Sequence, residues 1–94
     1  MSGELLMRSP AMLWRNVGER VVLAPPGGED FQELSPTAAE AWRLLERPQT
    51  LSELVQDVAA AYRVVPDSIA GDIRSLVDDL IARGALETMA DADD

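Results

Sequence analysis

Short apolar runs bounded by turn-forming residues occupy the first third of the chain. Residues 11–15 (AMLWR) and 20–24 (RVVLA) are rich in strand-forming side chains, and residues 16–19 (NVGE) between them have the composition of a hairpin turn. The segment 25–28 (PPGG) interrupts this pattern, and residues 29–34 (EDFQEL) form a third, more polar stretch. The pattern therefore predicts three strands, with the third at the edge of a sheet.

Helical periodicity begins after the third predicted strand. Ser35-Pro36 is typical of a helix start, because serine caps free backbone N–H groups and proline lacks the N–H that the first turn leaves unpaired. Thr50-Leu51-Ser52-Glu53 fits a capping box, and Pro66-Asp67 begins a third periodic stretch that stops at Gly84. We expect helices over residues 36–46, 51–62 and 66–83, followed by a short extended segment at residues 85–87.

Three strands followed by three closely spaced helices predict an α+β fold of the winged helix-turn-helix type. In this fold, a three-stranded antiparallel sheet packs at one end of a small helical bundle. A chain of 94 residues has room for a single hydrophobic core. We expect one domain over residues 11–88, a flexible N-terminus over residues 1–10 and an acidic, disordered tail over residues 89–94.

The chain contains no cysteine and no histidine. This excludes thiolate nucleophiles, imidazole bases and the usual zinc sites. The spacing of the 17 aspartate and glutamate residues does not match a calcium loop, and it does not indicate a buried pair of carboxylates. We therefore expect a binding protein without catalytic residues, cofactor or metal.

The formal net charge of -9 disfavours nucleic acid as a partner, because binding to phosphates requires a positive surface. The predicted third helix carries Arg74 and Arg83 against four aspartates, so it is unsuited to a DNA groove. No apolar run is long enough to span a bilayer, and the first residues lack the basic region of a signal peptide. We expect a cytoplasmic protein that binds no membrane. A winged-helix transcriptional regulator remains an alternative on architecture alone.

The predicted third helix is apolar over two neighbouring faces, about 100° apart. The two stripes consist of Ile69, Ile73, Leu76 and Leu80, and of Ala70, Arg74, Val77 and Ile81. Either the helix packs within the domain on both sides, or the second stripe forms one wall of a groove. In the second case the third strand forms the other wall, since an edge strand has free N–H and C=O groups that an extended peptide can pair with.

Four segments occur in a characteristic order. They are residues 31–45 (FQELSPTAAEAWRLL), residues 50–55 (TLSELV), residues 62–64 (YRV), and the stretch from Asp72-Ile73 through Leu80 to Gly84-Ala85-Leu86. Together they resemble the PqqD-like proteins, which are the peptide-recognition elements of pathways for ribosomally synthesised, post-translationally modified peptides. The resemblance extends over roughly residues 20–87.

The resemblance implies that the domain binds the leader segment of a precursor peptide as an added strand between the third strand and the third helix. It also implies delivery of the precursor to a separate processing enzyme, either a leader peptidase of the lasso-peptide type or a radical-SAM maturase. A homodimer through the same edge strand is a further alternative. The implied peptide contacts are Asp30, Phe31, Gln32, Glu33, Leu34, Ile73, Arg74, Val77, Asp78 and Ile81.

Overall fold

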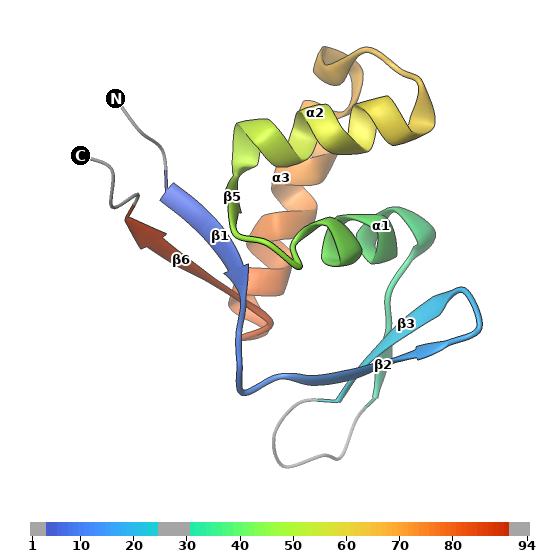
Figure 1. Ribbon diagram of the computed structural model, residues 1–94, viewed down its shortest axis with the longest axis vertical. Helices are drawn as coiled ribbons and strands as arrows, with labels where there is room; N and C mark the ends of the chain where they lie inside the picture. Colours follow the sequence, from blue (N-terminus) through green and yellow to red (C-terminus); the bar gives the residue numbers. More distant parts are fainter. Residues whose placement is uncertain (1–3, 25–30, 91–94) are drawn as a thin grey trace.

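Within its described residues, the chain forms an α+β arrangement of three helices and two small antiparallel sheets (Figure 1). The computed structural model describes residues 4–24 and 31–90. The elements, in chain order, are β1 (Glu4–Arg8), β2 (Leu13–Val17), β3 (Arg20–Ala24), β4 (Gln32–Glu33), α1 (Pro36–Leu44), β5 (Gln49–Thr50), α2 (Leu51–Tyr62), α3 (Pro66–Ala82) and β6 (Leu86–Ala90).

The first sheet, with strand order β5-β1-β6, was not predicted from the sequence. β1 pairs with β6 along its whole length and with β5 at Leu5 and Leu6. The expected flexible N-terminus is therefore wrong from Glu4 to Arg8. The expected tail is also wrong at residues 89–90, which belong to β6, while residues 91–94 lie outside the described part. The partners of β1 are distant in the sequence, so no local turn signal marks this strand.

The second sheet has the order β2-β3-β4 and contains the predicted hairpin. Val17 pairs with Arg20, so the turn is only two residues long, and Gly18 in this turn has a φ of 64°. Such tight turns favour glycine because it adopts a positive φ without steric cost. The shorter turn places β2 two residues later than the predicted strand. The third strand covers only Gln32 and Glu33, and the predicted break and strand start at residues 25–30 lie outside the described residues.

The three helices are confirmed, and so are their predicted start signals. Ser35 caps α1, since its Oγ accepts a hydrogen bond from the Ala38 N–H at 3.2 Å. The capping box of α2 is complete: Glu53 N–H donates to Thr50 Oγ1 at 3.1 Å, and Thr50 N–H donates to Glu53 Oε1 at 2.9 Å. α3 ends before Gly84, which has a φ of 79°. α1 is shorter than expected and ends at Leu44.

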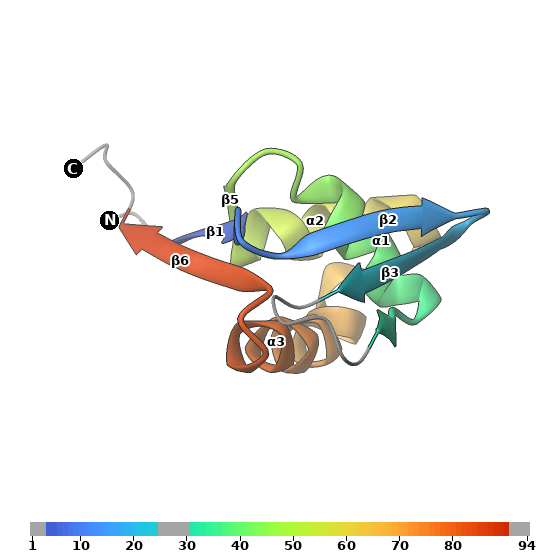
Figure 2. The same cartoon turned by 90° about the horizontal axis from the view of Figure 1, so that it is seen from below.

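The hydrophobic core lies between the helices and the inner faces of the sheets. The β1–β6 pair and the β2–β3 hairpin extend to opposite sides of the molecule (Figures 1 and 2). The largest fully buried side chains come from both sheets and from all three helices: Val21, Leu23, Trp42, Leu45, Leu54, Val58, Ile73, Leu80 and Leu86. One core therefore joins the two sheets through the helices.

Arg8 at the end of β1 connects this strand to the rest of the fold. Its guanidinium lies 4.7 Å from the ring centre of Trp14 and 5.1 Å from that of Trp42. Its Nε also donates to the Trp42 carbonyl oxygen at 2.9 Å, and its Nη2 donates to the same oxygen. Partial burial lowers the pKa of Arg8 from its ordinary value, and the nearby Glu46 carboxylate partly opposes this shift. These contacts link β1, β2 and α1.

Candidate functional site

The free edge of β4 is the first feature of a candidate site. β4 pairs with β3 through Val22↔Glu33 and Leu23↔Gln32, and no strand in the described part of the chain pairs with its other edge. The Leu34 N–H continues the pairing with β3 by donating to the Val21 carbonyl at 2.9 Å. The outer edge of β4 therefore has backbone groups that an added strand could pair with.

A groove of about 210 Å³ lies between β4 and α3. Its walls come from β4 and the start of α1 on one side, and from the C-terminal half of α3 on the other. In the view of Figure 2, α3 lies below the β2–β3 hairpin. The lining residues are Glu33, Leu34, Ser35, Ala38, Leu76, Asp79, Leu80 and Arg83.

The floor of this groove is apolar and its rim is charged. Leu34, Ala38 and Leu80 are buried, and Leu76 on α3 is half-buried. Glu33 and Asp79 are exposed on the two sides of the rim. Apolar side chains that enter the groove would therefore lose water contact, whereas polar ones would remain at the rim.

A polar bridge closes one end of the groove. Arg83 Nη1 donates to Gln32 Oε1 at 2.7 Å, and Arg83 Nη2 lies 2.8 Å from Asp79 Oδ2. These contacts join β4 directly to the last turn of α3. On the other side of β4, Arg20 Nε lies 3.4 Å from Glu33 Oε2, and both side chains are exposed. The Arg83 bridge connects the two walls at this end.

The predicted contacts on the strand side mostly line or border this groove. Glu33 and Leu34 line it, and Gln32 forms the bridge with Arg83. Phe31 is 71% exposed and lines a different hollow, on the outer face of the β2-β3-β4 sheet. Asp30 lies outside the described residues.

The predicted contacts on α3 do not line the groove. Ile73 and Val77 are 0% and 3% exposed, so the interpretation of Val77 as a groove wall is corrected: it is a core residue. Arg74 lines a separate hollow of about 500 Å³ between α2 and α3. Ile81 is half-buried against the core, and Asp78 is exposed.

The face of α3 that lies toward β4 is not the face predicted to form the groove wall. Leu76, Asp79, Leu80 and Arg83 have the spacing i, i+3, i+4 and i+7 and therefore share one face of the helix. Arg74, Asp78 and Ile81 lie on the opposite face of the helix. The spacing was visible in the sequence, but Asp79 and Arg83 made this face resemble a solvent-exposed one.

The described residues contain no group of three or more acidic side chains arranged to hold a metal ion. Within the same part of the chain, no helix is long and apolar enough to cross a membrane. The site is therefore defined by a backbone edge, an apolar floor and a charged rim.

Comparison with known proteins adds sequence and structural relationships. Residues 20–86 match the family model for coenzyme PQQ synthesis protein D, PqqD. A solved structure of TbiB1 in complex with the TbiA(beta) leader peptide is similar, with a TM-score of 0.77 and 27% sequence identity over 90% of this chain and 99% of that chain. No match was found among curated proteins.

A second structure shares the fold. It is the solution structure of the PqqD truncation of Methylobacterium extorquens PqqCD, described as a stand-alone recognition element for ribosomally synthesised and post-translationally modified peptides. The TM-score is 0.68 and the identity is 22%, with 88% of each chain covered. The three helices and antiparallel strands of the present chain thus have counterparts in this structure.

Proposed function

The chain belongs to the PqqD family, and we propose that it binds the leader segment of a ribosomally synthesised precursor peptide as an added strand between β4 and α3. The observation that supports this most directly is the free edge of β4 beside an apolar groove. The similar TbiB1 structure, which contains a leader peptide, supports the same class of ligand.

The geometry suggests how affinity and specificity are divided. Backbone hydrogen bonds to β4 hold the leader in an extended conformation and are independent of its sequence. Every second leader side chain then points toward the groove floor, where Leu34, Leu76 and Leu80 favour apolar residues. Glu33 and Asp79 at the rim are already paired with Arg20 and Arg83, so the rim adds little preference for a charged leader residue.

The α3 contacts that we propose replace most of those expected from the sequence. Leu76, Asp79, Leu80 and Arg83 line the groove, and they take the place of Ile73, Arg74, Val77, Asp78 and Ile81. We retain Gln32, Glu33 and Leu34 on the strand side.

The test is a titration of fluorescently labelled leader peptides, among them the TbiA(beta) leader peptide, followed by anisotropy. Leu76→Ser removes a half-buried apolar wall residue and is expected to weaken binding about tenfold, equivalent to about 1.4 kcal/mol. Leu44→Ser is the matched control, since Leu44 is also half-buried against the core but does not line the groove. Equal affinities for the two variants would contradict the proposed site.

Backbone pairing can be tested separately with N-methylated leader peptides. In an added strand, successive N–H groups point alternately toward β4 and away from it. Methylation should therefore abolish binding at every second position and have little effect at the positions between. A uniform response along the leader would count against an added strand.

We also propose that the chain delivers the bound precursor to a separate processing enzyme and has no catalytic role of its own. The β2–β3 hairpin and the α2–α3 pair are interpreted as a winged helix-turn-helix used for peptide binding. A DNA-binding role is disfavoured because α3 carries Arg74 and, just beyond its end, Arg83, against four aspartates. Whether the enzyme is a leader peptidase or a radical-SAM maturase can be decided by assaying which of the two is stimulated by the chain.

A further inference from the structure

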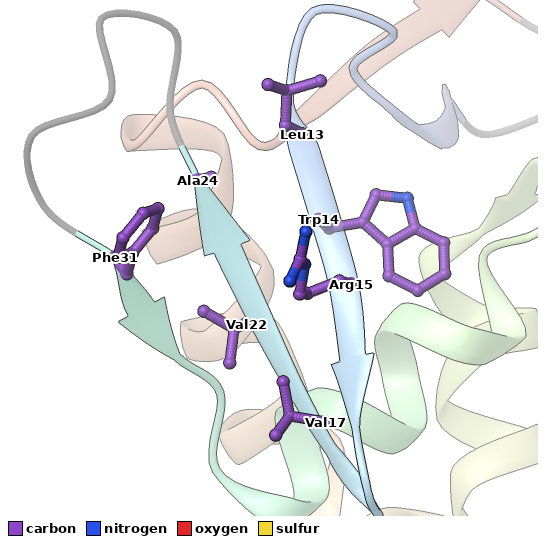
Figure 3. A pocket seen from close by; sticks show the side chains of 7 residues that line it. All are labelled: Leu13, Trp14, Arg15, Val17, Val22, Ala24 and Phe31. Carbon is purple, nitrogen blue, oxygen red and sulfur yellow. The ribbon is translucent and has the colours of Figure 1, made fainter.

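The outer face of the β2-β3-β4 sheet is an apolar surface distinct from the leader groove. Figure 3 shows its side chains, which surround a hollow of about 590 Å³. Leu13, Val17 and Phe31 are 65%, 51% and 71% exposed, respectively. Trp14 also borders the hollow, but it points to the other side of β2, where its ring meets Trp42 edge-on at 5.9 Å. We call this surface the outer face, defined by Leu13, Arg15, Val17, Val22, Ala24 and Phe31.

β3 has the composition of a strand that is covered on both sides. Val21 and Leu23 point inward and are 0% exposed, while Val22 and Ala24 lie on the outer face. Strands with one solvated face normally alternate apolar and polar residues, whereas continuous apolar runs are typical of strands covered on both faces. Single exposed apolar residues are common, but a contiguous group of them marks an interaction surface.

The leader strand proposed above cannot cover the whole outer face. Strands in a sheet lie about 4.8 Å apart, so a strand added beyond β4 would lie three spacings, roughly 14 Å, from β2. Side chains on a sheet contact neighbours within about 7–8 Å. The outward side chains of the leader would therefore reach Phe31, but not Leu13 or Val17.

A second copy of the chain is also a poor occupant. Five-residue strands and two inter-strand spacings give a face of roughly 17 by 10 Å, well below the roughly 800 Å² that each partner buries in a stable interface. Each copy also carries a net charge of -9, so two copies repel each other. A face of this size is suited to a transient contact in which a second molecule, such as the bound leader, provides the rest of the buried area.

The charge around the outer face differs from that of the whole chain. The described residues of this sheet, 13–24 and 31–34, contain two arginines, Arg15 and Arg20, and two glutamates, Glu19 and Glu33, so their local charge is zero. Arg20 is paired with Glu33 at 3.4 Å. Arg15 itself lines the hollow. A partner with an apolar patch and one carboxylate that meets Arg15 would therefore fit this face, although the rest of the chain would repel it.

We propose that the outer face docks a folded peptide-processing enzyme, through an apolar patch with a carboxylate opposite Arg15. A leader bound at β4 would place its outward side chains next to Phe31 and so extend the outer face by one strand. The enzyme would then contact the chain and the leader together. The inference rests on the proposed function for the position of the leader. It assigns Leu13 and Val17 to enzyme docking and not to leader binding.

The test compares the double variant Leu13→Ser/Val17→Ser with the control Val65→Ser. Val65 is 66% exposed in the connection between α2 and α3, and serine is well tolerated just before a helix. The probe is the processing enzyme that the chain stimulates in the assay described above, immobilised and titrated by interferometry with leader present. We expect the double variant to lose at least tenfold in enzyme affinity while its leader affinity by anisotropy stays within twofold. The control should match the unmodified chain in both assays.

Several outcomes would overturn the proposal. These are unchanged enzyme affinity of the double variant, an equal loss of leader affinity, or no enzyme binding by the unmodified chain. Light scattering that shows a dimer dissociated by the double substitution would assign the face to a second copy. If leader binding fails in every form while enzyme docking is lost only in the double variant, the proposed function is wrong and the docking face remains.

Discussion

The removal of Leu6 from the core is the sharpest test of the unexpected strand β1. Leu6 is 4% exposed and belongs to the core, while Leu5 on the opposite side of the strand is only half-buried. Leu6→Ala removes most of a buried leucine side chain and leaves a cavity, which in small domains costs about 2–4 kcal/mol. A domain of 94 residues has a total stability of roughly 5–14 kcal/mol, so this loss is a large fraction of it.

Thermal unfolding followed by circular dichroism measures this loss. At about 4–8 °C per kcal/mol for a domain of this size, Leu6→Ala should lower Tm by roughly 10–25 °C. Urea titration should give a lower midpoint with an unchanged slope, because the surface exposed on unfolding stays nearly the same. Leu5→Ala is the matched control and is expected to cost about 1 kcal/mol or less.

Equal unfolding temperatures of Leu6→Ala and Leu5→Ala would exclude a core role for Leu6. An unchanged Tm in a chain that lacks residues 1–8 would exclude a structural role for β1, because such a chain has lost Leu6, Arg8 and all of this strand. A flexible N-terminus, as the sequence pattern suggested, predicts no effect in either experiment. The two views therefore differ by a margin well above the error of a melting curve.

Three other substitutions test other parts of the fold. Val77→Asp places a carboxylate at a site that is 3% exposed and should abolish cooperative unfolding in circular dichroism; a folded variant that only loses leader binding would return Val77 to the groove. Arg8→Ala removes the hydrogen bonds to Trp42 and should cost about 2–3 kcal/mol in urea titrations, and a cost below 0.5 kcal/mol would exclude a structural role. Thr50→Ala should cost about 1 kcal/mol in the same assay, and an unchanged midpoint would show that the capping box contributes nothing.

The α+β class and the helices could be predicted because their signals are local, whereas the division of the strands into two sheets was not predicted. The caps at Ser35 and Thr50 act over three residues, and the hairpin turn at Gly18 joins adjacent strands. The predicted boundaries of β2 and β4 were less accurate, because turn length and sheet pairing determine where these strands begin and end, and strand propensity does not. β1 could not be predicted, because its pairing with β6 connects residues about 80 positions apart and leaves no local mark in the sequence.

The sequence predicts a site between the third strand and the third helix, where the structure has a groove, but it does not predict the α3 residues that line this groove. The strand wall of the groove, Glu33 and Leu34, could be predicted from chain order. These residues directly precede the α1 cap, Ser35, and belong to the last strand before the helices, which was expected at the sheet edge. The helix wall could not be predicted in the same way. The sequence shows that α3 has more apolar surface than one contact requires. Periodicity gives the angle between the two apolar stripes, but it does not tell which stripe faces β4.

The sequence by itself determined the helices, the hairpin, the acidic surface and the absence of cysteine and histidine, all of which depend on composition or on contacts within a few residues. Tertiary structure decided the β1 pairing and the rotation of α3 about its axis. Packing of α2 and the sheets against Ile73, Val77 and Leu80 sets that rotation, and it places Leu76 and Arg83 toward β4. A helix can meet its neighbours at several rotations with the same sequence, and burial of the most apolar combination of faces selects one of them.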